Sequence, residues 1–310
     1  MIHSAVLVAV GDSSSKKSEK FEADNWSEIQ EPPVDGTNMK LYAAVFHGES
    51  YYYFGGYSSA AIASILRLNG NSWTWSNVGQ INTSRHGHRV MLVGNTFMVV
   101  GGGGTVGNEA CVLADEQFTC TELSSSLTDY AWYPVLYLVD ENYGNCSITS
   151  TTGTTTEPTT TALTSAQTET ILVLNSNGGW KQAMLFNSAD QEKELTCFER
   201  DSTTEAHRSC SVNWQNQLVI FGGNSQKRQI ARLSGYKLEH IGDLSFDHWA
   251  GACSVMADEY IYLCFDYYDG NGRRCRRSNG PLEQFSDVAL SAHQHRWTQT
   301  SCSDSKFLLS

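Results

Sequence analysis

Tyr51-Tyr52-Tyr53-Phe54-Gly55-Gly56 is an apolar and aromatic run that ends in two glycines. Its pattern returns in residues 97–102 (FMVVGG) and 218–223 (LVIFGG), and degenerate copies lie at 6–11 and 260–266. The first glycine of each run, or the residue in its place, stands at positions 11, 55, 101, 222 and 266. The distances between successive runs are therefore 44, 46, 121 and 44 residues. The longest of these distances is expected to contain two repeats plus an insertion. A period in the forties, built on short strands, is typical of the blades of a β-propeller.

Each repeat predicts four strands. A first apolar run precedes the glycine strand, as in 42–46 and 89–93, and Gly or Asn turn residues join the two like a hairpin. Two further strands follow, and an aromatic residue opens the last one, as in 230–235 followed by Tyr236. We therefore expect an all-β fold, a β-propeller with six blades of four antiparallel strands. The alternative is a fragment of a larger propeller, because the chain opens at a glycine strand and closes after a first strand at 295–302.

The order of these strands resembles the kelch repeat, which also builds the central domain of galactose oxidase. The resemblance rests on the diglycine strand, the aromatic opening of the fourth strand, and Arg85-His86-Gly87-His88-Arg89 ahead of a first strand. It covers nearly all of a single domain, 1–310, apart from a Thr-rich low-complexity insertion at 147–170. Three copies have the diglycine and the others lack it. The resemblance implies a propeller whose blade-connecting loops bind another protein or a glycan.

Composition excludes two classes of partner. The formal net charge is −12, whereas binding to nucleic acid needs a positive surface. No apolar run reaches the length of a membrane-spanning helix. The apolar run 5–10 is too short for a signal peptide and has no basic flank, so we interpret it as a strand.

Nine cysteines bear on the compartment. Two pairs bracket short segments between neighbouring strands, and both are disulfide candidates: Cys111 with Cys120, and Cys264 with Cys275. A second group shares one register in the first strands of successive blades and is expected to behave as small buried hydrophobes: Cys210, Cys253 and Cys302. The chain has no CxxC motif and no paired Cys/His spacing, which disfavours a metal site.

Three features together predict an extracellular, secreted protein. Disulfides belong to oxidising compartments, and the Thr-rich stretch suits an O-glycosylated loop. Asn82 and Asn145 begin N-x-S/T sequons and are glycosylation candidates. An extracellular protein without a signal peptide would be truncated at its N-terminus, which agrees with the fragment alternative.

Catalytic motifs are missing from the sequence, so we predict a protein that is not an enzyme and has no cofactor. Glu239-x3-Asp243-x3-Asp247 is the one weak candidate, and it is similar to the E-x3-D-x3-H iron triad of plant specifier proteins, which are also kelch propellers. Its last position is Asp rather than His, and His248 is one residue out of step. A copper site like that of galactose oxidase is a second alternative, although no spacing selects its ligands.

Binding candidates are the basic and histidine residues of two segments. They are Arg85 and His86 ahead of a first strand, and Arg273, Arg274 and Arg277 in the one dense positive patch of an acidic chain. The simpler interpretation of that patch is a solvated strand with snorkelling side chains. The first hypothesis is a non-catalytic module that binds a protein or a glycan through loops. The alternatives are a structural module of a glycosylated matrix protein and a metal-dependent kelch-fold enzyme.

Overall fold

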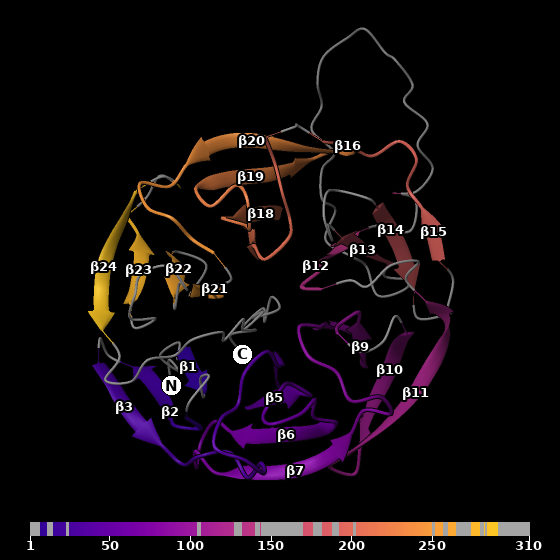
Figure 1. Ribbon diagram of the computed structural model, residues 1–310, viewed down its shortest axis with the longest axis vertical. Coiled ribbons are helices and arrows are strands. Elements are labelled where there is room, and N and C mark those ends of the chain that lie inside the picture. Colours follow the sequence, from indigo (N-terminus) through magenta and orange to yellow (C-terminus); the bar gives the residue numbers. More distant parts are fainter. Residues whose placement is uncertain are drawn as a thin grey trace, which may run out of the picture.

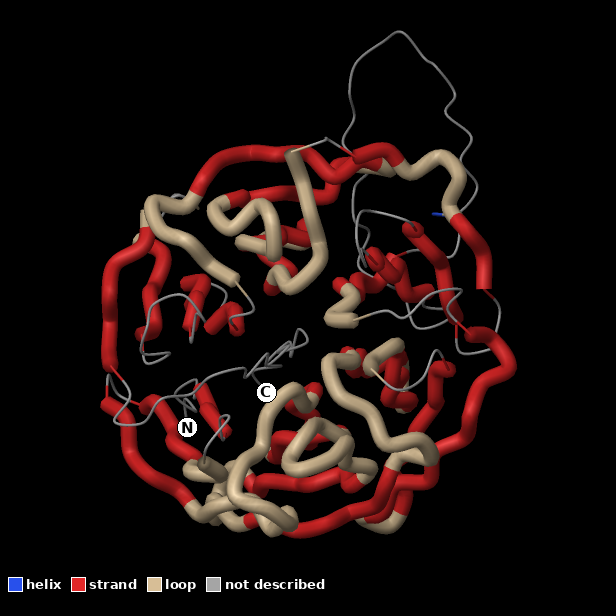
Figure 2. The backbone as a smooth tube through the Cα atoms, viewed as in Figure 1, coloured by secondary structure: helices blue, strands red, loops and turns tan. Residues whose placement is uncertain are grey.

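The structure is a computed structural model that describes residues 7–10, 15–22, 25–103, 107–126, 132–139, 143, 170–175, 182–187, 192–200, 203–249, 252–256, 260–264, 274–279, 282 and 284–290. Within these residues the chain is almost entirely strand and loop (Figure 2). No helix among them has the length and apolarity needed to cross a membrane.

The strands form six hydrogen-bonded sheets that follow one another along the chain. The first two sheets contain β1 (Leu7–Val10), β2 (Ser18–Glu22) and β3 (Asn25–Ile29), then β4 (Ala43–His47), β5 (Ser50–Phe54), β6 (Ser64–Asn69) and β7 (Trp75–Gln80). The next two contain β8 (Arg89–Val93), β9 (Thr96–Val100), β10 (Gly107–Ala114) and β11 (Gln117–Ser126), then β12 (Val135–Val139), β13 (Thr170–Asn175), β14 (Gln182–Asn187) and β15 (Glu192–Glu194). The last two contain β16 (Glu199–Arg200), β17 (Cys210–Trp214), β18 (Gln217–Phe221), β19 (Gln229–Ser234) and β20 (Lys237–Asp243), then β21 (Ala252–Met256), β22 (Tyr260–Cys264), β23 (Arg274–Ser278) and β24 (Phe285–Leu290).

The all-β prediction is confirmed, but the expectation that all six units are plain four-stranded blades is corrected. Four sheets have this composition, namely β4–β7, β8–β11, β12–β15 and β21–β24. The first sheet has three described strands, and in the fifth the short β16 adds a parallel strand beside β20. Thr170, which we placed in the Thr-rich insertion, begins β13, and the rest of that insertion lies outside the described residues.

The sheets stand in a ring, with the first strand of each four-stranded unit innermost (Figure 1). Innermost strands contact their neighbours in the order β4, β8, β12, β17 and β21. On the outer side β3 contacts β24, and Phe21 and Tyr262 meet with ring centroids 6.3 Å apart. The first sheet therefore lies against the last, and the chain returns to its own beginning.

Aromatic side chains fill the space between neighbouring sheets. Phe118, in the fourth strand of its sheet, lies 5.0 Å from Phe97 and reaches Tyr52 and Phe54 of the preceding sheet at 5.4 and 5.3 Å between ring centroids. The rings meet edge to face, the favoured geometry for aromatic pairs. Phe118 therefore fills the space between its own sheet and the preceding one.

The diglycines allow two loops to meet at close range. In two copies the second glycine donates its N–H to a carbonyl in the loop that leads to the next sheet: Gly56 to Arg85 (2.9 Å) and Gly223 to His248 (3.1 Å). Gly103, which follows the diglycine of a third copy, donates instead to His86 (2.7 Å) in the loop that leads to its own sheet. At Gly222, where φ is +64°, a Cβ would lie 1.8 Å from the carbonyl oxygen of His248. Only glycine fits that combination of conformation and contact.

Both predicted disulfides are present, Cys111–Cys120 and Cys264–Cys275, each joining residues paired across two neighbouring strands. The expectation that Cys210 and Cys253 are free buried thiols is wrong, because they form a third disulfide. Their strands, β17 and β21, are neighbouring innermost strands, so a shared register makes their side chains face each other. Cys197 is disulfide-bonded as well, and Cys302 lies outside the described residues.

Candidate ligand-binding face

One end of the ring gathers the loops that could hold a ligand. At this end the second strands finish and the innermost strands begin, so it collects the loops 55–63, 81–88, 101–103, 203–209 and 222–228. The backbone hydrogen bonds from the diglycines tie these loops to one another across sheet boundaries. We call this end the glycine face.

Three aromatic side chains from three loops meet on the glycine face. The His86 ring lies 5.2 Å from Tyr57 and 5.3 Å from Trp132, centroid to centroid, and we call these three residues the aromatic cluster. All three are half-buried, and the Lys40 ammonium lies 5.3 Å from the Tyr57 ring centre. A Cβ on Gly103 would lie 2.8 Å from the Trp132 ring, so the absence of a side chain there lets the rings meet.

His86 was predicted from the sequence as a binding residue, and the structure places it at the centre of this cluster. Burial lowers the pKa of His86, and the Lys40 ammonium lowers it further. The imidazole is therefore neutral at pH 7 and presents a flat ring rather than a cation. Trp132 and Tyr57 were not singled out from the sequence, because only the fold brings their loops beside residue 86.

Arg85 occupies a different environment from its neighbour. Its side chain is 1% exposed, and Nη2 pairs with Oε1 of Glu109, itself 0% exposed, at 2.5 Å. Nη1 donates to the carbonyls of Gly101 (3.1 Å) and Gly107 (2.5 Å). We expected Arg85 to serve a ligand, whereas its guanidinium points into the protein and is used by internal contacts.

Glu109 also binds the backbone of the loop 81–88, which carries Arg85. Its carboxylate accepts the backbone N–H groups of Asn82 (2.7 Å) and Thr83 (3.2 Å) as well as the Arg85 guanidinium. The network fastens the loop that precedes β8 to the strand β10. A buried charge pair with this many partners orders the loop that carries His86.

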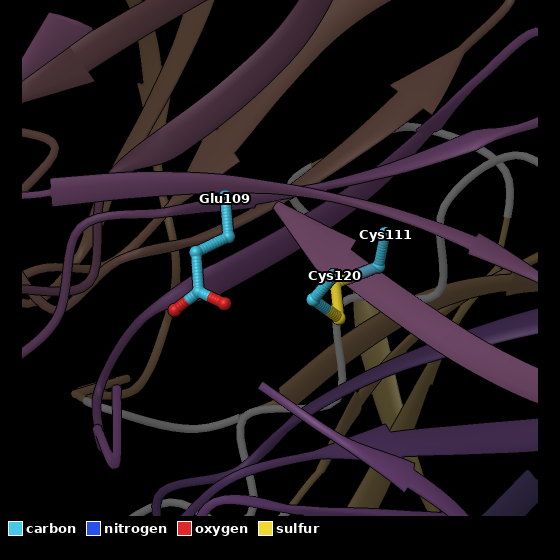
Figure 3. Close-up of side chains that lie close together, drawn as sticks. All are labelled: Glu109, Cys111 and Cys120. Atoms are coloured by element: carbon cyan, nitrogen blue, oxygen red, sulfur yellow. A yellow bond between two sulfur atoms is a disulfide. The ribbon is translucent and has the colours of Figure 1, made fainter. Parts of the chain in front are cut away.

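Figure 3 shows Glu109 beside Cys111 and Cys120, the one group of three metal-ligating residue types close together among the described residues. The two cysteines are joined in a disulfide, so neither offers a thiolate. The carboxylate is already occupied by Arg85 and two backbone amides. These residues do not fit a metal site.

The acidic candidates Glu239, Asp243 and Asp247 are not brought together by the fold. Each lies beside a different basic side chain: Glu239 lies 3.5 Å from Arg232, Asp243 lies 3.4 Å from His240, and Asp247 lies 2.7 Å from Arg228. They do not form one of the close groups of metal-ligating residues found in the described chain. The spacing resembled an iron triad, but β20 ends at Asp243 and the chain turns away before Asp247.

The basic patch lies on β23, away from the aromatic cluster. Arg274 is exposed, Arg277 is half-buried with its guanidinium 4.8 Å from the Tyr260 ring centre, and Arg273 lies outside the described residues. Arg276 between them stacks 3.9 Å from the Phe246 ring centre. Arg276 and Arg277 therefore lie over aromatic rings, as the snorkelling interpretation expects.

The two glycosylation candidates differ in what the structure describes. Asn82 is exposed on its loop, and its side-chain amide donates to the Cys120 carbonyl at 3.0 Å. Asn145 lies outside the described residues.

A row of residues with left-handed backbone lies just before the innermost strands. Leu41, Gly87, Tyr133 and Arg208 have φ of 60°, 65°, 52° and 56° and occupy equivalent positions in four successive sheets. The Gly87 N–H donates to the Leu41 carbonyl, and the Tyr133 N–H donates to the Gly87 carbonyl (2.8 and 2.7 Å), so the row is hydrogen-bonded from sheet to sheet. Sequence reasoning missed this row, although the 46-residue spacing of 41, 87 and 133 was available as a signal.

Two arginines lie at this row: Arg208, which belongs to it, and Arg89, two residues after Gly87. Arg89, the first residue of β8, places its guanidinium 5.9 Å from the Tyr133 ring centre, and Arg208 places its own 4.9 Å from the Trp249 ring centre. Burial raises the pKa of Tyr133 to about 12, while Arg208 and Arg89 act against that rise. Both cations are therefore within electrostatic reach of one phenol.

Comparison with known proteins supports the fold. No family model and no curated protein matches the sequence. Among solved structures the chain is similar to the one titled "Structure of YjhT", with a TM-score of 0.57 and 11% sequence identity over 87% of this chain and 88% of that chain. A sequence identity of 11% supports a shared fold and nothing further. Taken with the ring of antiparallel sheets, it shows that the chain is a β-propeller.

Proposed function

We propose that the chain is a non-catalytic kelch-type propeller of six blades that binds a glycan on its glycine face, outside the cell. The six sheets in one ring and the contact of the first sheet with the last support the blade number. The loop contacts made by the diglycines support the kelch assignment.

The aromatic cluster is the observation that carries the proposal. A sugar ring has a flat face of C–H groups that packs on an aromatic face and hydroxyls that hydrogen-bond at its edge. Tyr57, His86 and Trp132 supply rings, and the Lys40 ammonium and the loop backbone supply polar groups beside them. Sites with a few aromatic side chains and a few convergent polar groups are typical of small-ligand binding.

A glycan is favoured over a protein partner by the exposed surface. A stable protein interface buries about 800 Å² on each side around an apolar centre. Among the described residues the large hydrophobic side chains that are exposed are Val112 and Tyr260, which lie on different sheets. They do not form one apolar surface, whereas the aromatic cluster is compact and suits a few sugar rings.

The extracellular setting is supported by covalent structure. Three disulfides join described cysteines, and such bonds persist in oxidising compartments. The exposed Asn82 sequon agrees with passage through a secretory pathway. A purely structural matrix role would not require the aromatic cluster.

The test is binding of the purified full chain to a panel of neutral and acidic oligosaccharides, measured by calorimetry. We expect Trp132→Ala to weaken binding about tenfold or more, as loss of a central aromatic contact does. Trp73→Ala is the matched control, since Trp73 is also half-buried but lies in the β6–β7 turn at the opposite end of the sheets. Absence of binding to any glycan, or equal affinity of Trp132→Ala and wild type, would overturn the proposal.

A further inference from the structure

The left-handed row contains three residues other than glycine, Leu41, Tyr133 and Arg208, and the last two carry polar side chains. Gly87 shows that glycine serves this position, yet the next two sheets use Tyr133 and Arg208. A bulky residue in the left-handed region costs on the order of 1–3 kcal/mol and persists where the surroundings hold it, often at ligand sites. The strain places a phenol and a guanidinium at the inner end of the glycine face.

Arg89 adds a buried cation at the same place. Arg89 is 6% exposed, and its Nη1 has no hydrogen-bond partner among the residues that the structure describes. Within the described residues no carboxylate lies at ion-pair distance from it, and burial lowers its pKa to about 10. Arg85, four residues earlier, is also buried, but its guanidinium forms an ion pair with Glu109 and hydrogen bonds with backbone carbonyls. Arg85 is therefore paired, whereas Arg89 keeps an N–H donor that no described residue accepts.

We propose that Arg89, Tyr133 and Arg208, from three successive sheets, bind an oxyanion, a carboxylate or a phosphate, carried by the ligand. A guanidinium fork matches the two oxygens of either group, and a phenol O–H donates a further hydrogen bond. The bound anion supplies the acceptor that Arg89 lacks. Trp132 of the aromatic cluster is adjacent, with its ring centroid 5.9 Å from that of Tyr133.

This inference rests on the proposed function for the identity of the ligand, since it makes the glycan an anionic one. The oxyanion site itself depends on the three residues named. The experiment therefore tests the site with small anions and the glycan separately.

The first arm measures the Tm of the full chain in sodium acetate or sodium phosphate against sodium chloride at equal ionic strength. A bound anion at about 100 times its Kd is expected to raise Tm by roughly 4 °C for a chain of this length. Arg89→Met and Tyr133→Phe should abolish the shift, and Arg67→Met, a surface arginine on β6, should retain it. A larger shift with acetate identifies a carboxylate ligand, and a larger shift with phosphate identifies a phosphorylated one.

A structural role for Arg89 predicts a different result. If the guanidinium supports the fold, Arg89→Met lowers Tm in chloride. If instead Arg89 is a buried charge that waits for the anion of the ligand, its removal leaves Tm in chloride unchanged or raises it. A lower Tm in chloride, or an anion-induced shift that survives in Arg89→Met, would overturn the inference.

The second arm repeats the glycan panel with Arg89→Met. Tighter binding of acidic than neutral glycans, lost in this variant, supports both proposals. Equal binding of neutral and acidic glycans overturns the oxyanion site and leaves the glycan function standing. An anion-induced Tm shift that depends on Arg89, without binding of any glycan, leaves the oxyanion site and overturns the glycan function.

Discussion

Replacing Gly222 with alanine tests the physical reason for the diglycine repeat. The backbone at Gly222 has φ of +64°, and an added Cβ would lie 1.8 Å from the His248 carbonyl oxygen and 2.7 Å from its carbon. Gly94 is a matched control, since φ is +58° there and nothing lies within 4 Å of a Cβ. Both substitutions carry the same conformational penalty, so their difference isolates the contact.

The magnitude follows from three terms. The left-handed conformation costs alanine about 1–2 kcal/mol at either position. At Gly222 the carbonyl of His248 must also retreat by more than an ångström, which adds about 1–3 kcal/mol of overpacking. That retreat breaks the 3.1 Å hydrogen bond from the Gly223 N–H to the same carbonyl, for about another 1–3 kcal/mol. We expect losses of about 3–8 kcal/mol for Gly222→Ala and about 1–2 kcal/mol for Gly94→Ala.

The assay is equilibrium unfolding in guanidinium chloride, followed by tryptophan fluorescence with the disulfides intact. The free energies of unfolding of the two variants should differ by at least about 2 kcal/mol. If the two variants lose the same free energy, the close approach of the loops is not what selects glycine, and the reasoning is refuted.

Three further outcomes are expected. Glu109→Gln should cost about 3–5 kcal/mol by leaving a buried guanidinium uncompensated, while Glu116→Gln, which breaks a surface ion pair, should change stability by less than about 1 kcal/mol in the same assay. Burial, aided by Arg276, lowers the pKa of His248 to about 3, below its unfolded value, so its contribution to stability is complete above about pH 6.5 and falls as the pH falls. Urea unfolding at pH 7 and pH 5 should show a loss of about 2 kcal/mol from this group, and a pH dependence unchanged in His248→Gln would contradict the assignment. Cys253→Ser opens a loop of 43 residues to Cys210 and should lower stability by about 4 kcal/mol, and peptide mapping that finds both thiols free in the wild type would refute the pairing.

The candidate site was predictable in part. His86 was identified from its place before a first strand, and it lies on the glycine face as a member of the aromatic cluster. Arg85, its neighbour, is buried against Glu109, a partner on β10 that lies 24 residues away and that only the fold brings beside it. Glu239, Asp243 and Asp247 share a regular spacing, but each lies beside a different basic residue, and β20 ends at Asp243 before Asp247 is reached.

Features that depend on neighbours along the chain could be predicted from the order of the residues. The period of the diglycine runs predicted the strands and their order, and hairpin adjacency predicted Cys111–Cys120 and Cys264–Cys275, since antiparallel pairing brings such residues face to face. Contacts between sheets could not be predicted in this way and became visible in the folded chain. Cys210 meets Cys253, Trp132 meets His86, and Arg89 meets Tyr133 across sheet boundaries, at separations of 43, 46 and 44 residues. Those contacts depend on the angle and distance at which one sheet packs on the next, which no local pattern of residues encodes.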